Sequence, residues 1–295
     1  GGGTPSLFSP DAIADLISQV RALLPLAPLC EITLEANPGT FERERFAAFA
    51  QAGVTRLSIG VQSFNDSHLQ ALGRVHNSAQ ALAAVEEAAR SFNTYNLDIM
   101  YALPGQTPQQ LQDDIDTALK FQPPHISIYH LTVEPNTLFA KYPPHNLPDD
   151  DAAYGMLDVI TERTQQAGMQ RYEVSAYARA GHACVHNQNY WGFGDYIGIG
   201  AGAHGKISFP HRVVRQVKVR DPQRYMQQAM QGQALAQEHD VARADLPFEF
   251  MLNALRLSQG FALADFTART GLALTAIEQQ LNDAEAKGWI QRDLS

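Results

Sequence analysis

The chain has 295 residues, a formal net charge of −9 and 45% hydrophobic residues. This length allows a full core in one large domain, or in a large domain with a smaller one. The acidic balance argues against nucleic acid as the main partner, because such sites need a basic field. We find no secretory signal and no apolar run long enough for an integral membrane segment. Composition therefore predicts a globular, cytoplasmic protein.

Cysteine occurs only twice, as Cys30 and Cys184, which are far apart and in no CxxC pattern. Two thiols are too few for a disulfide framework or for a metal cluster held within this chain. They also fit a reducing compartment. We therefore expect no metal site formed by this chain alone.

Strands alternate with helices through the first two thirds of the chain. We predict strands over residues 31–39, 56–64, 95–105 and 125–135. The predicted helix caps between and before them are Ser9, Thr40, either Asn65 or Asp66, Ser78 and Thr107. Strands separated by helices pair in parallel through right-handed crossovers. A doubly wound sheet and a β/α barrel both fit this pattern.

Polar residues recur at or near the predicted carboxyl ends of these strands: Glu35, Gln62, Asp98 and Thr132. Each of them alone is explained by a cap or a buried hydrogen-bonding group. Together they indicate a site, since both architectures place ligands at the carboxyl ends of strands. The repetition leads us to favour an α/β fold with a partial β/α barrel.

The pattern changes beyond residue 170. Residues 171–179 alternate like a strand, and the glycine-rich residues 196–209 predict a strand against a turn. From about residue 213 we expect a mostly helical part. Its helices begin at Asp221-Pro222 and near residue 247, and residues 261–293 read as helix, turn, helix and the start of a strand, like a winged-helix core. We therefore predict domains over residues 1–212 and 213–295, with the second packed against the barrel and not reading DNA.

Several motifs then follow one another in a specific order: GGGTPS, EITLEANPGT, RLSIGVQSFN, LGRVHN, LDIMYALPGQT and HNQNYWGFGDYIGIGAGAHG. With them the chain resembles the radical S-adenosylmethionine (SAM) proteins over nearly its whole length. Within that superfamily it is similar to the HemW-type haem chaperones, relatives of oxygen-independent coproporphyrinogen III oxidase. The resemblance implies that the opening glycines end the second barrel strand and do not belong to a cloning remnant.

The resemblance also exposes a gap. In the family, a CxxxCxxC loop ahead of GGGTP supplies three thiolates to a [4Fe–4S] cluster, whose remaining iron position takes the amino and carboxylate groups of SAM. Cys30 and Cys184 do not match those positions. We therefore expect this chain to be a fragment, or the visible part of a longer one, and to hold no cluster as it stands.

The SAM contacts that the resemblance implies start at the first residues. The backbone of Gly2, Gly3 and Thr4 would face the methionine amino group, and Glu35 would accept from the same ammonium. Arg74 would pair with the methionine carboxylate, which suits its planar fork. Without the family pattern, Arg74 is better explained as a solvated surface arginine.

The nucleoside part of SAM would be held further along the chain. The resemblance implies that Gln62 and Asp98 hold the ribose hydroxyls and that the backbone near Thr132 borders the adenine. These roles are expectations that come from the family pattern alone.

A second informative stretch is HNQNYW, residues 186–191. The His186 imidazole can ligate haem iron, Tyr190 offers a flat apolar surface to a macrocycle, as does Trp191, and Asn187 can orient the histidine. On chemistry alone, a capped turn with two aromatic side chains in the core explains the stretch better. The resemblance changes the weighting, because HNxxYW marks the haem-chaperone branch. Possible second ligands are His182, Cys184 and His204.

Two functions remain open. A haem chaperone would bind haem and pass it to an acceptor such as a respiratory enzyme, assisted by SAM and the cluster. An oxidase would cleave SAM reductively to a 5′-deoxyadenosyl radical, which abstracts hydrogen from a coproporphyrinogen III propionate and leads to its decarboxylation. The HNxxYW stretch favours the chaperone. A barrel enzyme that uses Glu35 and Asp98 as acid and base has no support beyond their location.

Overall fold

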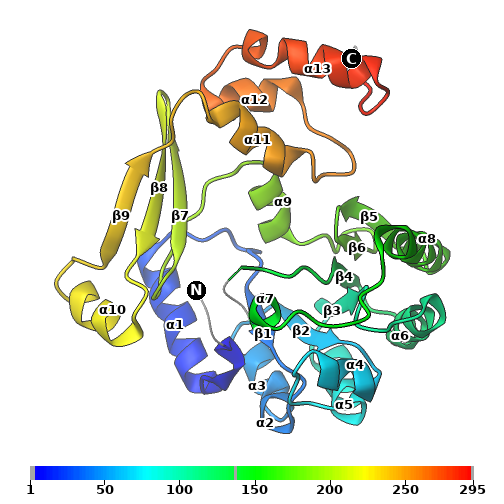
Figure 1. The fold of residues 1–295 in the computed structure, drawn as a ribbon. Coiled ribbons are helices and arrows are strands. Elements are labelled where there is room, and N and C mark those ends of the chain that lie inside the picture. The colour runs from blue at the N-terminus through cyan, green and yellow to red at the C-terminus, as the bar shows by residue number, and fades with distance from the viewer. Residues whose placement is uncertain (1–3, 136–137, 294–295) are drawn as a thin grey trace. The chain divides into compact units, whose positions relative to one another are not determined.

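The computed structural model describes residues 4–135 and 138–293. The chain forms two compact units, Thr4–Ala183 and Cys184–Ser295, which are taken separately below (Figure 1). The predicted boundary between residues 212 and 213 stays a prediction, and in the structure the units meet at Ala183 and Cys184. Within the described ranges, no helix is both long enough and apolar enough to cross a membrane.

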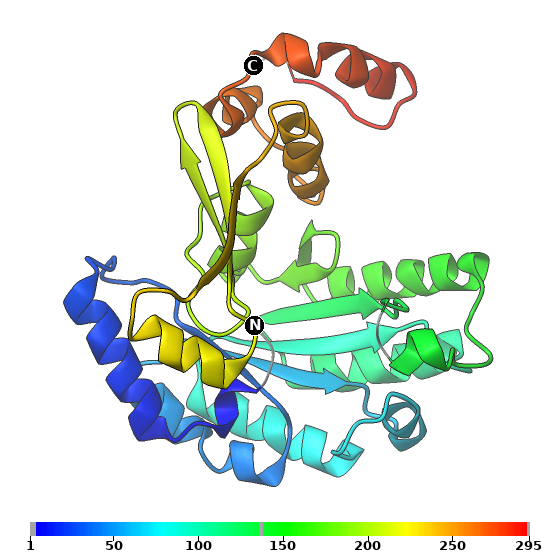
Figure 2. The same ribbon diagram turned by 60° about the vertical axis from the view of Figure 1, so that its left-hand side comes forward.

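The first unit is built on one six-stranded sheet. Its strands, in spatial order, are β1 (Thr33–Ala36), β2 (Arg56–Gln62), β3 (Tyr95–Tyr101), β4 (His125–His130), β6 (Ala176–Ala178) and β5 (Gln170–Glu173). The first four pair in parallel, as predicted. Figure 2 shows β2, β3 and β4 running in one direction, so their carboxyl ends share one edge of the sheet.

The prediction of one strand over residues 171–179 is wrong. The segment folds back on itself as β5 and β6, which pair in antiparallel orientation. The turn between them is held by two side chains: the Glu173 carboxylate accepts from the Ser175 N–H at 3.1 Å, and Arg171 donates to the Val174 carbonyl at 2.8 Å. Local hydrogen bonds of this kind are not visible in an alternating pattern of residues.

Helices pack against one face of this sheet and follow its outer side in Figure 1. The helices of the unit are α1 (Pro10–Leu23), α2 (Thr40–Arg43), α3 (Phe46–Gln51), α4 (Asp66–Ala71), α5 (Ser78–Ser91), α6 (Pro108–Lys120), α7 (Leu138–Lys141) and α8 (Asp150–Gln166), with a short 3₁₀ turn at Pro5–Leu7. Phe46 and Phe49 on α3 are completely buried, as the sequence predicted. Apolar residues at helical spacing thus face the core.

Three of the five predicted helix caps are confirmed: Ser9, Asn65 and Thr107. The other two are each displaced by one residue. Gly39 precedes α2, with Thr40 as its first residue, and Asn77 caps α5 by accepting from the Gln80 N–H at 2.9 Å. Ser78 is the first residue of α5, and its N–H donates to the Asp66 carboxylate at 2.7 Å.

The two faces of the sheet differ in chemistry. Leu57 and Ile59 of β2 and Leu97 and Ile99 of β3 are completely buried under the helices. Because side chains alternate across a strand, the residues between them, polar in the main, point to the other face. In a doubly wound sheet both faces lie under helices and both are apolar. The polar face therefore argues against a doubly wound sheet, and it carries the candidate site.

The second unit contains more strand than predicted. An antiparallel sheet is formed by β7 (His204–Phe209), β8 (Arg212–Lys218) and β9 (Leu235–Asp240). The expectation of a mostly helical part from residue 213 is therefore wrong up to Asp240. In β8, Val213 and Val214 are buried, which is typical of β-branched residues on a packed sheet.

The rest of the second unit is helical, in agreement with the predicted helices. Its helices are α9 (Val185–Trp191), α10 (Pro222–Ala229), α11 (Leu246–Ala254), α12 (Leu263–Thr270) and α13 (Glu278–Ala286), with a 3₁₀ turn at Leu274–Ala276. Phe250 of α11 lies at the centre of the core and makes edge-on contacts with Phe193, Phe261 and Phe266. No strand follows α13 in the part described, up to residue 293.

Candidate functional site

Three polar side chains surround Gly60 on the polar face of the first unit's sheet. A Cβ atom at this position would lie 3.1 Å from Gln62 Nε2, 3.6 Å from Arg74 Nη2 and 3.6 Å from Asn37 Oδ1. A larger residue at position 60 would fill the space that these side chains enclose. The absence of a side chain here thus keeps a polar cradle open at the ends of β1 and β2.

Asp98, in the middle of β3, belongs to the same group. Burial is the main reason why the pKa of Asp98 is raised to about 6, and the negative charge of Glu35 raises this pKa further. The hydrogen bonds from Asn96 and Ser58 and the positive charge of Arg74 act in the opposite direction and lower the pKa of Asp98. Burial also lowers the pKa of Arg74, while Asp98 raises it. Charges influence one another in this way only at short range. The structure therefore gathers Glu35, Gln62, Arg74 and Asp98, as the sequence led us to expect.

Gln62 reaches this place through an unusual backbone. It has a φ of 68° although it is not glycine, and the pairing of β2 with β3 shifts register between Ile59 and Gln62. A left-handed conformation costs a non-glycine residue about 1–2 kcal/mol, and such strain gathers at functional sites. The bulge turns the end of β2 so that the Gln62 amide lies beside Gly60.

The segment between α4 and α5 carries Arg74 and is anchored at both sides of it. The Arg74 N–H donates to the Leu69 carbonyl at 2.9 Å. Two residues later, the buried His76 places Nε2 3.1 Å from the Val61 carbonyl of β2. A carbonyl only accepts, so Nε2 carries the proton. His76 lies in the LGRVHN motif, but the sequence does not reveal its role, because the contact joins residues 15 positions apart.

The remaining predicted SAM residues are placed as follows. Thr4 accepts a hydrogen bond from the Asn37 amide at 3.1 Å, which brings it to the edge of the Gly60 cradle. Gly2 and Gly3 lie outside the described residues. Thr132 is exposed beyond the end of β4, and its hydroxyl donates to the His130 carbonyl at 3.3 Å.

In the second unit, the predicted haem residues lie on the short helix α9. His186 is exposed, and its ring centroid lies 5.8 Å from that of Tyr190, one helical turn later. Tyr190 stacks on Tyr196 with 4.8 Å between the ring centroids, and their hydroxyls are 3.0 Å apart. Asn187 lies next to His186 on the same helix. Tyr190 and Trp191 are half-buried, so they are neither free nor fully part of a core.

A buried cation fixes the loop that follows α9. Lys206 is 1% exposed, and its Nζ donates to the Phe193 carbonyl at 2.9 Å, to Asp195 at 3.0 Å and to the Ser208 hydroxyl at 2.9 Å. Burial lowers the pKa of Lys206, and Asp195 raises it. A fully bonded buried ammonium holds its neighbours in one geometry. It therefore ties the end of α9 to β7.

The predicted second haem ligands differ in exposure. Cys184 is buried just before α9, while His204 is exposed at the start of β7. His182, in the first unit, places Nδ1 3.1 Å from the Thr94 hydroxyl. Among the described residues there is no group of three or more His, Cys, Asp or Glu side chains that could hold a metal ion.

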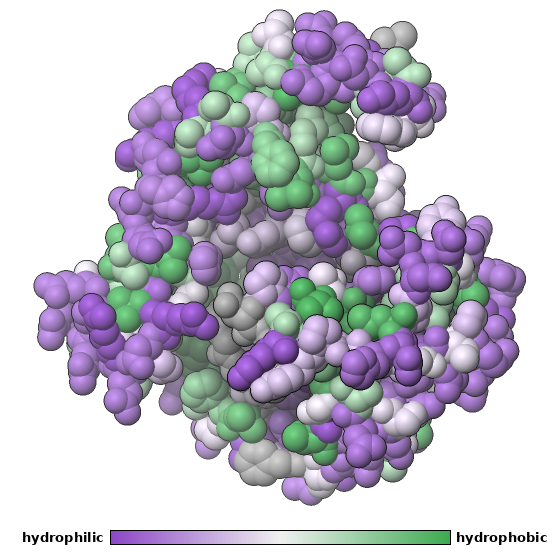
Figure 3. Space-filling view, viewed as in Figure 1, coloured by the Kyte–Doolittle hydropathy of each residue, from purple (hydrophilic) through white to green (hydrophobic). Residues whose placement is uncertain are grey.

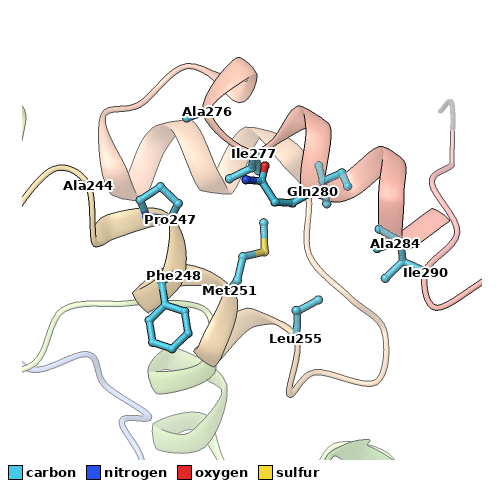
Figure 4. Close-up of a pocket in the computed structure, with 11 residues that line it drawn as sticks. Ala244, Pro247, Phe248, Met251, Leu255, Ala276, Ile277, Gln280, Ala284 and Ile290 are labelled. Carbon is cyan, nitrogen blue, oxygen red and sulfur yellow. The ribbon is translucent and has the colours of Figure 1, made fainter. Parts of the chain in front are cut away.

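A separate cavity of about 510 Å³ lies in the C-terminal helices (Figure 4). Phe248 and Met251 of α11, with Leu255 directly after this helix, form one wall, and Ile277 and Gln280 belong to the other. Hydrophobic side chains also reach the surface over α11 in Figure 3. None of the residues that line the cavity is ionisable. It therefore offers no charge to the ammonium and carboxylate of SAM or to the propionates of haem.

Comparison with protein families matches two parts of the chain. Residues 1–118 match the radical SAM superfamily, and residues 241–294 match the HemN C-terminal domain. The first match contains the strands and the loop that gather around Gly60, and the second contains α11, α12 and α13.

Several curated proteins are similar to this chain over nearly its whole length. The chain is 47% identical to the "Heme chaperone HemW" of Haemophilus influenzae and 48% identical to that of Escherichia coli, over 98% of this chain in both cases. It spans 75% and 76% of the length of these two relatives. The protein of the same name from Bacillus subtilis is 34% identical and is covered to 79%.

A solved structure shows the same fold. Coproporphyrinogen III oxidase (HemN) from Escherichia coli superimposes with a TM-score of 0.79 over 98% of this chain and 70% of that protein. Identity is 22%, so this likeness concerns the fold alone. The fold is thus of the α/β type, with part of a radical SAM sheet and a helical C-terminal region.

Proposed function

The chain belongs to the HemW family of haem chaperones within the radical SAM superfamily, and from this membership we propose that it binds haem, holds SAM on the polar face of its parallel sheet and passes haem to an acceptor protein. An acceptor such as a respiratory enzyme and a cytoplasmic location belong to the same proposal. The observation that carries it is the gathering of Glu35, Gln62, Arg74 and Asp98 around the open cradle at Gly60.

The charges of this group fit those of SAM. Glu35 would accept from the methionine ammonium, and Arg74 would pair with the methionine carboxylate. Gln62 and Asp98 would bond the ribose hydroxyls. Gly2, Gly3 and Thr4 at the amino end and Thr132 at the adenine complete the proposed site. When bound, SAM supplies an activated carbon–sulfur bond, and the residues named here bind and orient the molecule.

The iron–sulfur cluster that the superfamily implies does not fit the residues of this chain. A cluster needs three thiolates close together, whereas the sequence contains two cysteines, one in each compact unit. The described residues also contain no alternative group of metal ligands. No step of the proposed mechanism therefore runs through a cluster.

Haem is the cargo in this proposal, and α9 would receive it. The exposed His186 would ligate the iron, and the Tyr190 ring, supported by its stack on Tyr196, would contact the macrocycle. Asn187 would hold the imidazole in position. Lys206 fixes the loop after α9, so this surface is formed before haem arrives. Binding of haem therefore costs less conformational entropy than it would on a flexible loop.

Haem titration tests this assignment. We expect the protein to show a Soret band with haem and His186→Ala to weaken haem binding at least tenfold, because the iron loses a ligand. The matched control is His211→Ala, which removes an exposed histidine from the turn between β7 and β8 of the same unit. It should leave the affinity unchanged.

Two results would contradict the proposal. An unchanged spectrum and affinity in His186→Ala would remove His186 as the ligand. Conversion of coproporphyrinogen III to protoporphyrinogen by the full-length protein, reconstituted with its cluster and supplied with reductant and SAM, would assign the oxidase function in place of haem transfer.

A further inference from the structure

A line of hydrogen bonds crosses four strands and ends on Asp98. The register pairs Ser58 of β2 with Asn96 of β3, and Asn96 with His125 of β4. Asn96 Nδ2 lies 2.8 Å from Asp98 Oδ1 and 2.9 Å from the Ser58 hydroxyl, which itself lies 3.2 Å from Asp98 Oδ2. On the other side, Asn96 Oδ1 is 2.7 Å from His125 Nδ1. His125 Nε2 is 2.9 Å from the Tyr172 hydroxyl of β5.

The chemistry of the groups fixes the direction of this line. An ionised Asp98 only accepts, so the Asn96 amide nitrogen faces it and the Asn96 oxygen faces His125. That oxygen also only accepts, so His125 Nδ1 carries the proton. Burial lowers the pKa of His125 to about 3, which keeps the ring neutral. Nε2 is then free to accept from the Tyr172 hydroxyl. Every donor therefore points toward Asp98.

We propose that His125 and Asn96 are positioning residues that present Asp98 as an oriented, ionised acceptor for the ribose hydroxyls of SAM. The inference rests on the SAM site proposed above. Neither residue touches the proposed ligand. They act through the carboxylate, whose orientation they fix from behind.

The surrounding charges explain why such support is needed. Asp98 faces Glu35 from β1, which disfavours its ionised form, and Arg74 from the loop after α4, which favours it. His125 faces Arg56 of β2 and also His182, both of which disfavour a charged ring. Without the Asn96 and Ser58 donors, burial and Glu35 would keep Asp98 protonated to a higher pH. A protonated carboxyl is a poorer acceptor for a sugar hydroxyl.

The ligand-free protein provides the first test. In ¹⁵N-histidine-labelled protein between pH 6 and 8, we expect His125 to be neutral with the proton on Nδ1, the less common tautomer in water. A proton on Nε2, or a charged imidazolium in this range, would overturn the proposal. This measurement needs no variant and no SAM.

A pair of variants tests the consequence for binding. An asparagine side chain can place an N–H near the position of histidine Nδ1, whereas leucine places none there. We expect His125→Leu to bind SAM about threefold more weakly at pH 6.5 and equally at pH 8.5, because the pKa of Asp98, about 6 in the wild type, should rise by about one unit in the variant. His125→Asn should retain the wild-type profile. Tyr95→Phe removes a buried hydroxyl from the opposite face of β3 and is the control.

The two hypotheses fail in different ways. If neither wild type nor variants bind SAM, the proposed SAM site is wrong, while the His125 tautomer still decides the direction of the line. If wild type binds SAM and His125→Leu shows the same pH profile, the SAM site stands and the positioning role is refuted. If His125→Leu does not fold, the tautomer measurement alone decides whether the positioning role stands.

Discussion

The ionised form of Asp98 destabilises the folded protein, although it is the form proposed to bind the ribose of SAM. Its pKa is raised from 3.8 to about 6 in the folded protein, with burial as the largest cause. The folded state therefore binds the proton more tightly than the unfolded state does. The free energy of unfolding falls as pH rises from about 4 to 6, and the full cost is present above pH 6. A group that costs stability and lies at a polar site is typical of a functional role.

Replacing this carboxylate should stabilise the protein and weaken binding. We expect Asp98→Asn to raise the free energy of unfolding at pH 7 by about 1–2 kcal/mol, and the gain to shrink toward pH 4, where wild-type Asp98 is protonated. Urea unfolding at pH 7 and pH 4.5 measures both. The control is Asp158→Asn, at an exposed position of α8. A loss of stability at pH 7 in Asp98→Asn would show that its hydrogen bonds outweigh its burial.

At the scale of the elements, the segment between α4 and α5 turns an ordinary surface arginine into a site residue. His76 links this segment to the Val61 carbonyl, and burial is the first cause that lowers the pKa of His76, so the ring stays neutral. Arg74 is then held beside Gly60 and Asp98. The Arg74 N–H anchors this segment to the Leu69 carbonyl, and the hydrogen bond between His76 and Val61 ties it to β2.

Removal of that bond should release Arg74. We expect His76→Ala to weaken SAM binding about tenfold and to lower the free energy of unfolding by about 1 kcal/mol, because the Val61 carbonyl keeps the Ser63 N–H at 2.9 Å but loses the hydrogen bond from His76. His76→Gln should restore most of both, since its amide N–H can reach the position of Nε2. Calorimetric titration and urea unfolding give the two values. Equal SAM affinity in wild type and His76→Ala would disprove the positioning role of this segment.

The elements also show what a sequence can predict. Parallel pairing and the meeting of Glu35, Gln62 and Asp98 were predictable, because they follow from strand order and the shared carboxyl edge. The line from Tyr172 to Asp98 was not, since it depends on which residues face one another across β2, β3, β4 and β5. The strand β9 was missed because its partners in β8 are distant in the sequence. The strand β8 was within reach of sequence analysis, since it forms a hairpin with β7 and contains several valines.

At the scale of the whole molecule, the proposed SAM site and the proposed haem site belong to different compact units. The unit Thr4–Ala183 carries the cradle at Gly60, and the unit beginning at Cys184 carries His186 and Tyr190 on α9. The oxidase HemN shares this fold at 22% identity, whereas relatives named haem chaperones are 47% and 48% identical. One fold can host different functions, so the assignment depends on the two sites.

Calorimetric titration of wild type and Arg74→Ala with SAM tests the central claim most directly. We predict that wild type binds SAM and that Arg74→Ala binds at least tenfold more weakly, because the methionine carboxylate loses its charged partner. Arg90→Ala, which removes an exposed arginine of α5, should bind as wild type does. Equal affinity in wild type and Arg74→Ala would contradict a SAM site on this face of the sheet.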